Sequence, residues 1–199
     1  MLAKKLEYLY IDTGAMYRAL TLKILRSGIS INDENAVSKI AEETSIILKQ
    51  GEPQEVYMDG ENVTELIRTP AVSKYVSHVS SIKSVREKLV ACQRKIAQQH
   101  SVVMDGRDIG SCVLQNAEFK FFLDASLNER VERRYQEMIL KGFSIDKVKV
   151  RSELEKRDHL DSSRKISPLI KADDALTINT TNLTPEEVTD IILRIVKGG

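Results

Sequence analysis

Along this chain, segments whose apolar residues recur with the period of a helix alternate with short segments that have the pattern of a β-strand. Residues 8–11 form a β-prone run, and residues 15–25 then carry apolar side chains at a helical period that ends at Gly28. Residues 101–104 are continuously apolar, which predicts a parallel strand buried on both faces. Further helices are expected over 32–41, 70–80, 85–99, 126–140, 146–157 and 184–196, and further strands over 118–123 and 175–178. This alternation predicts an α/β domain, a parallel sheet flanked by helices.

Residues 44–68 follow a different pattern. Two β-prone runs, 44–48 and 55–58, are separated by Gln50-Gly51-Glu52-Pro53, and a turn signal at Asp59-Gly60 follows. Two or three short antiparallel strands are expected here. We therefore expect one domain over residues 1–199 with a small antiparallel β insert at 44–68.

Two helix starts carry the sequence pattern of a capping box. Ser126 is followed three residues later by Glu129. Thr184 is followed by Pro185, which suits the first helical position, and then by Glu187. Each threonine or serine is expected to cap its helix together with the glutamate.

Composition narrows the class of protein. The chain has 199 residues, 42% of them apolar and 30% charged, which is typical of a soluble globular protein. The net charge of +1 supplies no global field for nucleic acid or a membrane surface, and no apolar run approaches the length of a membrane span. Cys92 and Cys112 are too few and too far apart for a disulfide framework or a metal site. We expect two ordinary buried thiols and a cytoplasmic setting.

Two polar segments fall at the carboxyl ends of predicted strands, where open parallel sheets bind ligands. They are Asp12-Thr13-Gly14 and Asp105-Gly106-Arg107-Asp108. Arg18 lies about one helical turn after Gly14 and can point back toward the same crevice. Taken singly, Arg18 could equally lie on a solvated helix face, and Arg107 with Asp108 could be a surface ion pair. Together they favour a site for a ligand with a phosphate and a hydrogen-bonding base.

At this point the chain resembles a known family. The segments Asp12–Arg18 (DTGAMYR), Asp105–Asp108 (DGRD) and Arg157-Asp158, followed by Asp161 and Arg164, are similar in order and spacing to the motifs of bacterial-type cytidylate kinases. These enzymes form a branch of the nucleoside monophosphate kinases that is marked by a β-rich insert like the one expected at 44–68. The resemblance covers essentially the whole chain.

The resemblance implies a role for nine residues. Arg18 and Arg107 would hold the acceptor phosphate, and Arg157 and Arg164 would reach the phosphates as a lid closes; of these, Arg107, Arg157 and Arg164 would be catalytic. Asp108, Ser77 and Arg86 would read cytosine with Thr13 nearby, and Asp161 would bind the sugar. A carboxylate suits the exocyclic amine that cytosine has and uracil lacks.

Other readings of these side chains stay open. Without the resemblance, Ser77 and Arg86 could lie on a solvated helix face. Arg157 and Arg164 belong to a charged run, 153–164, in which exposed pairing along a helix is the default. Arg130, Arg133 and Arg134 could serve the donor nucleotide or be surface charges.

The reaction implied by the resemblance is transfer of the γ-phosphoryl group of ATP to CMP or dCMP, giving CDP or dCDP in pyrimidine metabolism. Mg²⁺ would accompany ATP as the cofactor, and the protein itself would supply no metal site. The implied partners are the nucleotides CMP, dCMP and ATP, with neither nucleic acid nor membrane, and we expect a monomer.

The chain departs from the family's pattern before Ile11. A phosphate-binding loop, G-x-x-x-x-G-K-S/T, should come first, yet residues 1–10 contain no glycine, and residues 1–6 resemble the second half of the helix that follows such a loop. We therefore expect an N-terminal truncation that removes one strand of the sheet and leaves the chain inactive or impaired. The alternatives are a non-catalytic CMP-binding module that retains only the acceptor site, and a monophosphate kinase with another base preference.

Overall fold

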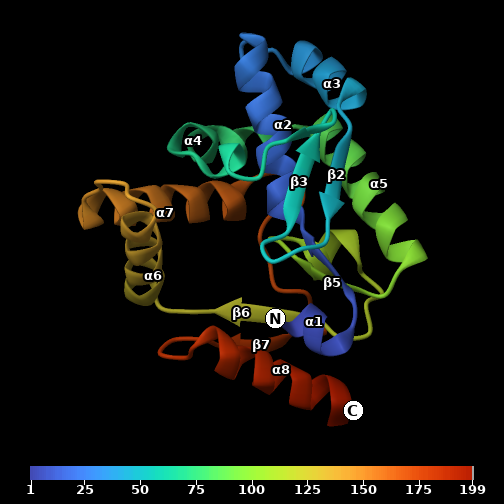
Figure 1. Ribbon diagram of the computed structural model, residues 1–199, viewed down its shortest axis with the longest axis vertical. Helices are drawn as coiled ribbons and strands as arrows, with labels where there is room; N and C mark the ends of the chain where they lie inside the picture. Colours follow the sequence, from blue (N-terminus) through green and yellow to red (C-terminus); the bar gives the residue numbers. More distant parts are fainter. Residues whose placement is uncertain (199) are drawn as a thin grey trace.

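The predicted alternation of helices and strands is confirmed in the structure, a computed structural model that describes residues 1–198 (Figure 1). The strands are β1 (Leu9–Asp12), β2 (Ile46–Lys49), β3 (Glu55–Met58), β4 (Glu61–Asn62), β5 (Val102–Asp105), β6 (Phe121–Asp124) and β7 (Leu176–Asn179). The α-helices are α1 (Leu2–Leu6), α2 (Thr13–Ser27), α3 (Glu34–Glu43), α4 (Pro70–Val79), α5 (Lys83–Gln99), α6 (Leu127–Leu140), α7 (Lys147–Ser163) and α8 (Pro185–Gly198). A 3₁₀ turn, η1 (Leu66–Arg68), precedes α4, and a π-helix, η2 (Ile109–Val113), follows β5.

Three small sheets organise the strands. β1 pairs in parallel with β5, so that Asp12 stands beside Asp105, and β6 pairs in parallel with β7. The predicted insert is present as the antiparallel sheet β2-β3-β4. Between residues 1 and 198, no ladder joins the β1-β5 pair to the β6-β7 pair.

The predicted burial of 101–104 on both faces is wrong. Val102, Val103 and Met104 are only half-buried, because β5 has a single neighbouring strand. Leu123 and Leu176 in the other parallel pair are likewise 53% and 51% exposed. Two-stranded sheets cannot cover the apolar faces that a wider sheet would bury.

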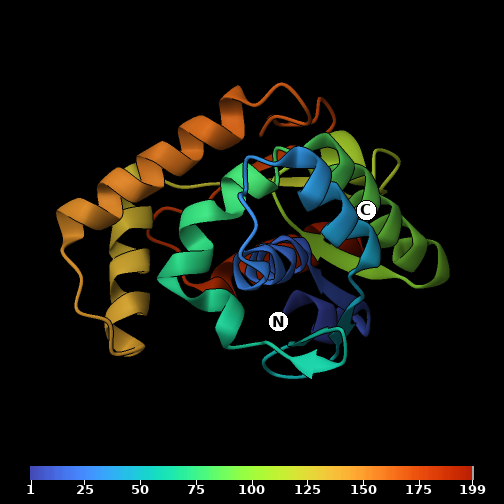
Figure 2. The ribbon, with the colours of Figure 1, turned by 90° about the horizontal axis from the view of Figure 1, so that it is seen from above.

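Helix α2 is the centre of the hydrophobic core. Its side chains Met16, Leu20 and Ile24 pack with residues of α3, α4 and α5, while Ala15 and Ala19 pack against the insert. Figure 2 looks nearly along α2 and shows the other helices around it. Gly28 ends the helix in the left-handed conformation with φ 72°, as its position after the apolar period predicts.

Helices α6 and α7 pack against each other at one side of the molecule, where α7 lies across the end of α6 and extends toward α4 (Figure 1). Only Val150 and Asp161 are buried in α7. The predicted helix 146–157 continues to Ser163, which brings Asp161 and Arg164 back toward the core helices. Of the helices described between residues 1 and 198, none combines the length and apolarity needed to cross a membrane.

One of the two predicted capping boxes is complete. Thr184 Oγ1 accepts a hydrogen bond from the Glu187 amide, and the Glu187 carboxylate accepts one from the Thr184 amide. Ser126 caps α6 through its hydroxyl, but the Ser126 amide donates to Thr181 Oγ1 and Glu129 binds Arg133 instead. The hydrogen bond from the Ser126 amide to the Glu129 carboxylate, which would complete this capping box, therefore does not form.

The first turn of α2 lies against the end of β5. The polar segment Asp12-Thr13-Gly14 is the start of this helix: Asp12 is the N-cap and accepts a hydrogen bond from the Ala15 amide at 2.8 Å. Thr13 Oγ1 donates to the Asp105 carbonyl at 2.7 Å. A Cβ atom on Gly106 would lie 2.3 Å from Thr13 Oγ1 and 2.7 Å from Ile109 Cδ1. Glycine at position 106 thus permits the close approach of two segments that are distant in sequence.

We predict that Gly106→Ala lowers the free energy of unfolding by about 1–3 kcal/mol, because Thr13 is buried and hydrogen-bonded and cannot move aside. Urea denaturation followed by circular dichroism measures the change. Gly110→Ala is the matched control, since its new methyl group would meet the flexible Lys120 side chain at 3.2 Å and the Ala172 Cβ atom at an ordinary contact distance of 3.5 Å. Equal shifts in the two variants would contradict the close-approach argument.

Candidate functional site

Arginine and aspartate side chains from four parts of the chain gather where β1 and β5 end. They come from the first turns of α2, the loop after β5, helix α5 and the end of α7. Five guanidinium groups pair with three carboxylates: Arg18 with Asp12, Arg86 and Arg164 with Asp108, and Arg107 and Arg157 with Asp161. We call these eight residues the arginine cluster. The arginine cluster has more cations than anions, an arrangement that favours binding of an anion.

Asp108 is the buried carboxylate at one end of the arginine cluster, with 5% of its surface exposed. Arg86 Nη2 donates a hydrogen bond to Asp108 Oδ2, and Arg86 Nη1 donates to the Ser80 carbonyl at 3.3 Å. Arg164 Nη2 lies 3.8 Å from Asp108 Oδ1, which is an ion pair but too long for a hydrogen bond. Arg86 is therefore a buried partner of Asp108, and the alternative of a solvated helix face for Arg86 is wrong.

Asp161 is the carboxylate at the other end. Arg107 Nε donates to Asp161 Oδ2 at 3.3 Å, and Arg157 Nε lies 3.7 Å from the same oxygen. Desolvation, followed by repulsion from Arg107, lowers the pKa of Arg157 to about 10, and desolvation also lowers the pKa of Arg164. Arg157 stays charged near neutral pH, and the crowding of the guanidinium groups favours a ligand that brings negative charge.

Asp12 links this cluster to the carboxyl end of β1. Its Oδ2 accepts a hydrogen bond from Arg18 Nη2 at 2.7 Å, so Arg18 does fold back over the first turn of α2. On the neighbouring strand, Asp105 accepts a hydrogen bond from the Tyr10 hydroxyl at 3.0 Å. Desolvation and repulsion from Asp12 raise the pKa of Asp105. Two carboxylates thus stand side by side at this edge of the sheet.

Some predicted residues lie elsewhere or have other partners. Ser77 is half-buried on α4, and no hydrogen bond joins its side chain to the arginine cluster among residues 1–198. Thr13 is buried and commits its hydroxyl to the Asp105 carbonyl. Three further arginines form ion pairs with carboxylates outside the arginine cluster: Arg130 with Asp158, Arg133 with Glu129 and Arg134 with Glu137.

Buried polar atoms without a hydrogen-bond partner concentrate in this site. Of the eight such atoms in the part of the chain that the structure describes, four belong to the arginine cluster, one each to Tyr17 and to Ser111 of η2, and two to Gln93 of α5. Sequence reasoning did not select Tyr17 or Ser111. The signal for Tyr17 was its place between Met16 and Arg18 in the first motif, although its helical phase reads as core. Because buried polar groups are normally satisfied, the unpaired N–H donors of the arginine cluster favour a ligand that is rich in acceptors.

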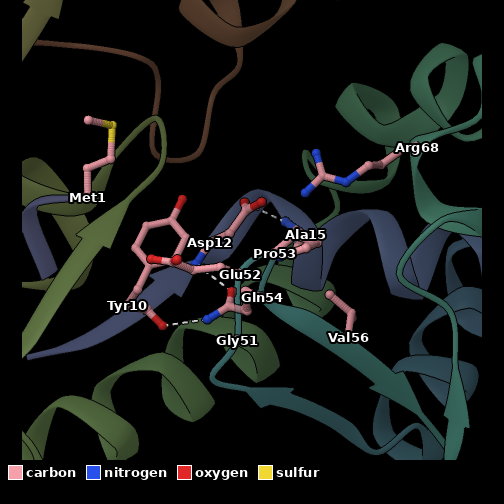
Figure 3. A pocket seen from close by; sticks show the side chains of 10 residues that line it. All are labelled: Met1, Tyr10, Asp12, Ala15, Gly51, Glu52, Pro53, Gln54, Val56 and Arg68. Carbon is pink, nitrogen blue, oxygen red and sulfur yellow. Dashed lines mark hydrogen bonds between the residues drawn. The ribbon is translucent and has the colours of Figure 1, made fainter. Parts of the chain in front are cut away.

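A pocket of about 350 Å³ opens beside the cluster at Asp12 (Figure 3). Gln54 ties the insert to β1 here, since its amide donates to the Tyr10 carbonyl and accepts from the Asp12 amide. Arg68 points toward the pocket from η1, and its guanidinium group forms no hydrogen bond or ion pair with residues 1–198. Sequence reasoning missed Arg68, because its local sequence carries no recognisable signature.

Comparisons with known proteins agree with the resemblance found in the sequence. The family model described as cytidylate kinase matches residues 1–198. The chain is 51% identical to the cytidylate kinase of Pediococcus pentosaceus, over 100% of this chain and 88% of that protein. It is 52% identical to the cytidylate kinase of Caldanaerobacter subterraneus subsp. tengcongensis, over 98% of this chain and 86% of the relative, and 50% identical to that of Bacillus licheniformis, over 98% and 88%.

The fold agrees as well, because parallel strands flanked by helices, with a small antiparallel sheet inserted after α3, are consistent with a nucleoside monophosphate kinase. The match spans all of the described residues, and the identity is near one half over almost the whole chain. The chain therefore belongs to the cytidylate kinase family of nucleoside monophosphate kinases.

Proposed function

We propose that the arginine cluster binds CMP or dCMP and presents its phosphate as the acceptor of the γ-phosphoryl group of ATP, which gives CDP or dCDP. The observation that carries this proposal is the combination of a buried carboxylate with several guanidinium groups that have unpaired N–H donors. A carboxylate suits a base that carries an amine, and guanidinium groups suit a phosphate. Relatives that share about half of the sequence are named cytidylate kinases.

On this proposal, Arg18 and Arg107 hold the acceptor phosphate, and Arg157 and Arg164 add charge from the end of α7. The Arg107 side chain is 45% exposed and can reach a ligand, while Arg18 keeps its Nε unpaired. No covalent intermediate is needed, because phosphoryl transfer is catalysed mainly by positioning and by neutralising charge on the phosphates. Asp161, buried between Arg107 and Arg157, is placed to accept a hydrogen bond from the sugar.

Base recognition is proposed to rest on Asp108. Arg86 occupies Asp108 Oδ2, whereas Oδ1 has only the long ion pair with Arg164. Oδ1 is therefore the oxygen able to accept from the exocyclic amine of cytosine. We propose that Ser77 also binds the base. Thr13 lies nearby, where its hydroxyl binds the Asp105 carbonyl and holds the loop that contains Asp108.

Mg²⁺ and ATP complete the proposed reaction. Magnesium in such reactions is held by nucleotide phosphates with one or two carboxylates and lowers the charge on the transferring group. In the described part of the chain no three metal-ligating side chains come together. Both carboxylate oxygens of Asp12 are occupied, by the Ala15 amide and by Arg18, so Mg²⁺ would be held by the phosphates of ATP. We also propose a single, monomeric, cytoplasmic domain with residues 44–68 as its insert.

The rate of phosphoryl transfer from ATP tests the part of the proposed site that would bind the phosphate donor. No segment of residues 1–199 has the sequence G-x-x-x-x-G-K-S/T, whose amides and lysine cradle the donor phosphates. We expect the pure 199-residue polypeptide to bind CMP in a calorimetric titration and to transfer phosphoryl groups from ATP far more slowly than the Pediococcus pentosaceus relative assayed beside it. This is the behaviour of a CMP-binding module.

The two measurements separate the possible failures. Ordinary rates of CDP formation by this polypeptide would overturn the prediction of impaired transfer and leave CMP binding supported. A folded polypeptide without measurable affinity for CMP would overturn the proposed function itself.

The preference for CMP over UMP tests the proposed role of Asp108. Asp108→Ala should abolish the preference for CMP over UMP, but it leaves Arg86 buried without its partner and is expected to destabilise the fold. Asp108→Asn keeps the size and an oxygen for Arg86. We expect it to weaken CMP binding about 10-fold to 100-fold, in line with about 1–3 kcal/mol for one base contact, and to leave UMP binding unchanged.

Calorimetric titration of each variant with CMP and UMP measures this preference. Asp173→Asn, a change at an exposed aspartate outside the cluster, is the control. A preference for CMP that survives Asp108→Asn would show that another group reads the base. Tighter binding of UMP than of CMP by the unmodified polypeptide would favour the kinase with another base preference.

A further inference from the structure

The Tyr17 hydroxyl is an unused hydrogen-bond donor in the interior of the protein. Tyr17 lies in the second turn of α2, is 7% exposed, and its hydroxyl has no partner among the described residues. The next hydroxyl on the same helix behaves differently: Thr21, fully buried, donates to the Tyr17 carbonyl at 2.8 Å. A buried hydroxyl without a partner loses its bonds to water and gains none in return, so free protein is less stable for having it.

The surroundings of Tyr17 place its ring at the Asp108 end of the arginine cluster. The Arg86 guanidinium lies over the ring, 5.6 Å from its centroid. Burial raises the pKa of Tyr17 to about 12, and the charges that act on it most are those of Arg86, Asp108 and Arg164. Tyr17 is therefore a neutral donor at neutral pH, beside the carboxylate proposed to bind the base amine.

A donor is needed at that end. A pyrimidine that offers an exocyclic amine to Asp108 also presents ring acceptors, O2 and, in cytosine, N3. Arg86 already uses one hydrogen of each terminal nitrogen, one on Asp108 and one on the Ser80 carbonyl. The Tyr17 hydroxyl therefore offers a further donor at that end, beside the unpaired Nε of Arg86.

Building on the proposed function, we propose that Tyr17 binds the base, its hydroxyl donating a hydrogen bond to a ring acceptor of the pyrimidine held by Asp108. The hydroxyl is then satisfied only in the complex. Tyr17→Phe removes the oxygen and keeps the ring, so it tests this bond with little change in packing.

The two effects of Tyr17→Phe have opposite signs. We expect the dissociation constant for CMP to rise about tenfold, while the urea midpoint of the free protein stays constant or rises, because an unsatisfied hydroxyl has been removed. Titration with UMP identifies the acceptor: an equal loss for both nucleotides assigns O2, which they share, and a loss for CMP alone assigns N3. Tyr135→Phe on α6, a hydroxyl outside the cluster, should change neither quantity.

An unchanged dissociation constant for CMP in Tyr17→Phe would overturn the inference and leave the ring with a packing role only. A lower urea midpoint for the free variant would also overturn it, since the hydroxyl would then have a partner in the free protein. Either result leaves the proposed function standing as long as the unmodified polypeptide binds CMP. Absence of CMP binding by that polypeptide would count against the proposed function instead.

Discussion

The buried ion pair between Arg86 and Asp108 is the interaction on which the rest of the site depends. Both side chains are almost fully excluded from solvent, so each needs the other to offset the cost of desolvation. The pair joins α5 to the loop after β5, and the second bond of Arg86, to the Ser80 carbonyl, joins both to the end of α4. Since Arg107 is the neighbour of Asp108 and η2 follows directly, this pair also fixes the positions of Arg107 and of the first residue of the π-helix.

Around that pair the protein accumulates more guanidinium groups than its own carboxylates satisfy. Desolvation and mutual repulsion lower the pKa values of Arg157 and Arg164, and four of the five guanidinium groups retain a buried nitrogen without a partner. Such an arrangement costs free energy in the unliganded protein. A nucleotide phosphate offers several acceptor oxygens and negative charge at once, so its binding would relieve both deficits, and the affinity would come partly from strain already present in the free protein.

Local sequence signals predicted the elements well and tertiary partnerships poorly. The helix starts at Asp33 and Thr184 and the end of α2 at Gly28 follow from side-chain and backbone rules that act within a few residues. The second half of the Ser126 box failed, because Thr181, 55 residues away, competes for its amide. The exposure of β5 likewise depends on which strands flank it, which periodicity within the strand cannot reveal.

In the site, too, local spacing predicted a residue's position well, whereas contacts between distant segments were not predictable. Arg18 was placed from helical spacing alone, and the structure has it over Asp12 as expected. Arg86 gave no local sign of burial, since α5 is rich in charge and only contact with Asp108, 22 residues later, takes its side chain out of water. Tyr17 was not selected from the sequence; its ring is part of the core, and the Arg86 guanidinium of the arginine cluster lies over it. Because α2 supplies both the central packing surface and the first residues of the site, a single helix face serves two purposes there. The periodicity of apolar residues detects only the packing role of this helix. The unpaired Tyr17 hydroxyl is apparent only in the structure.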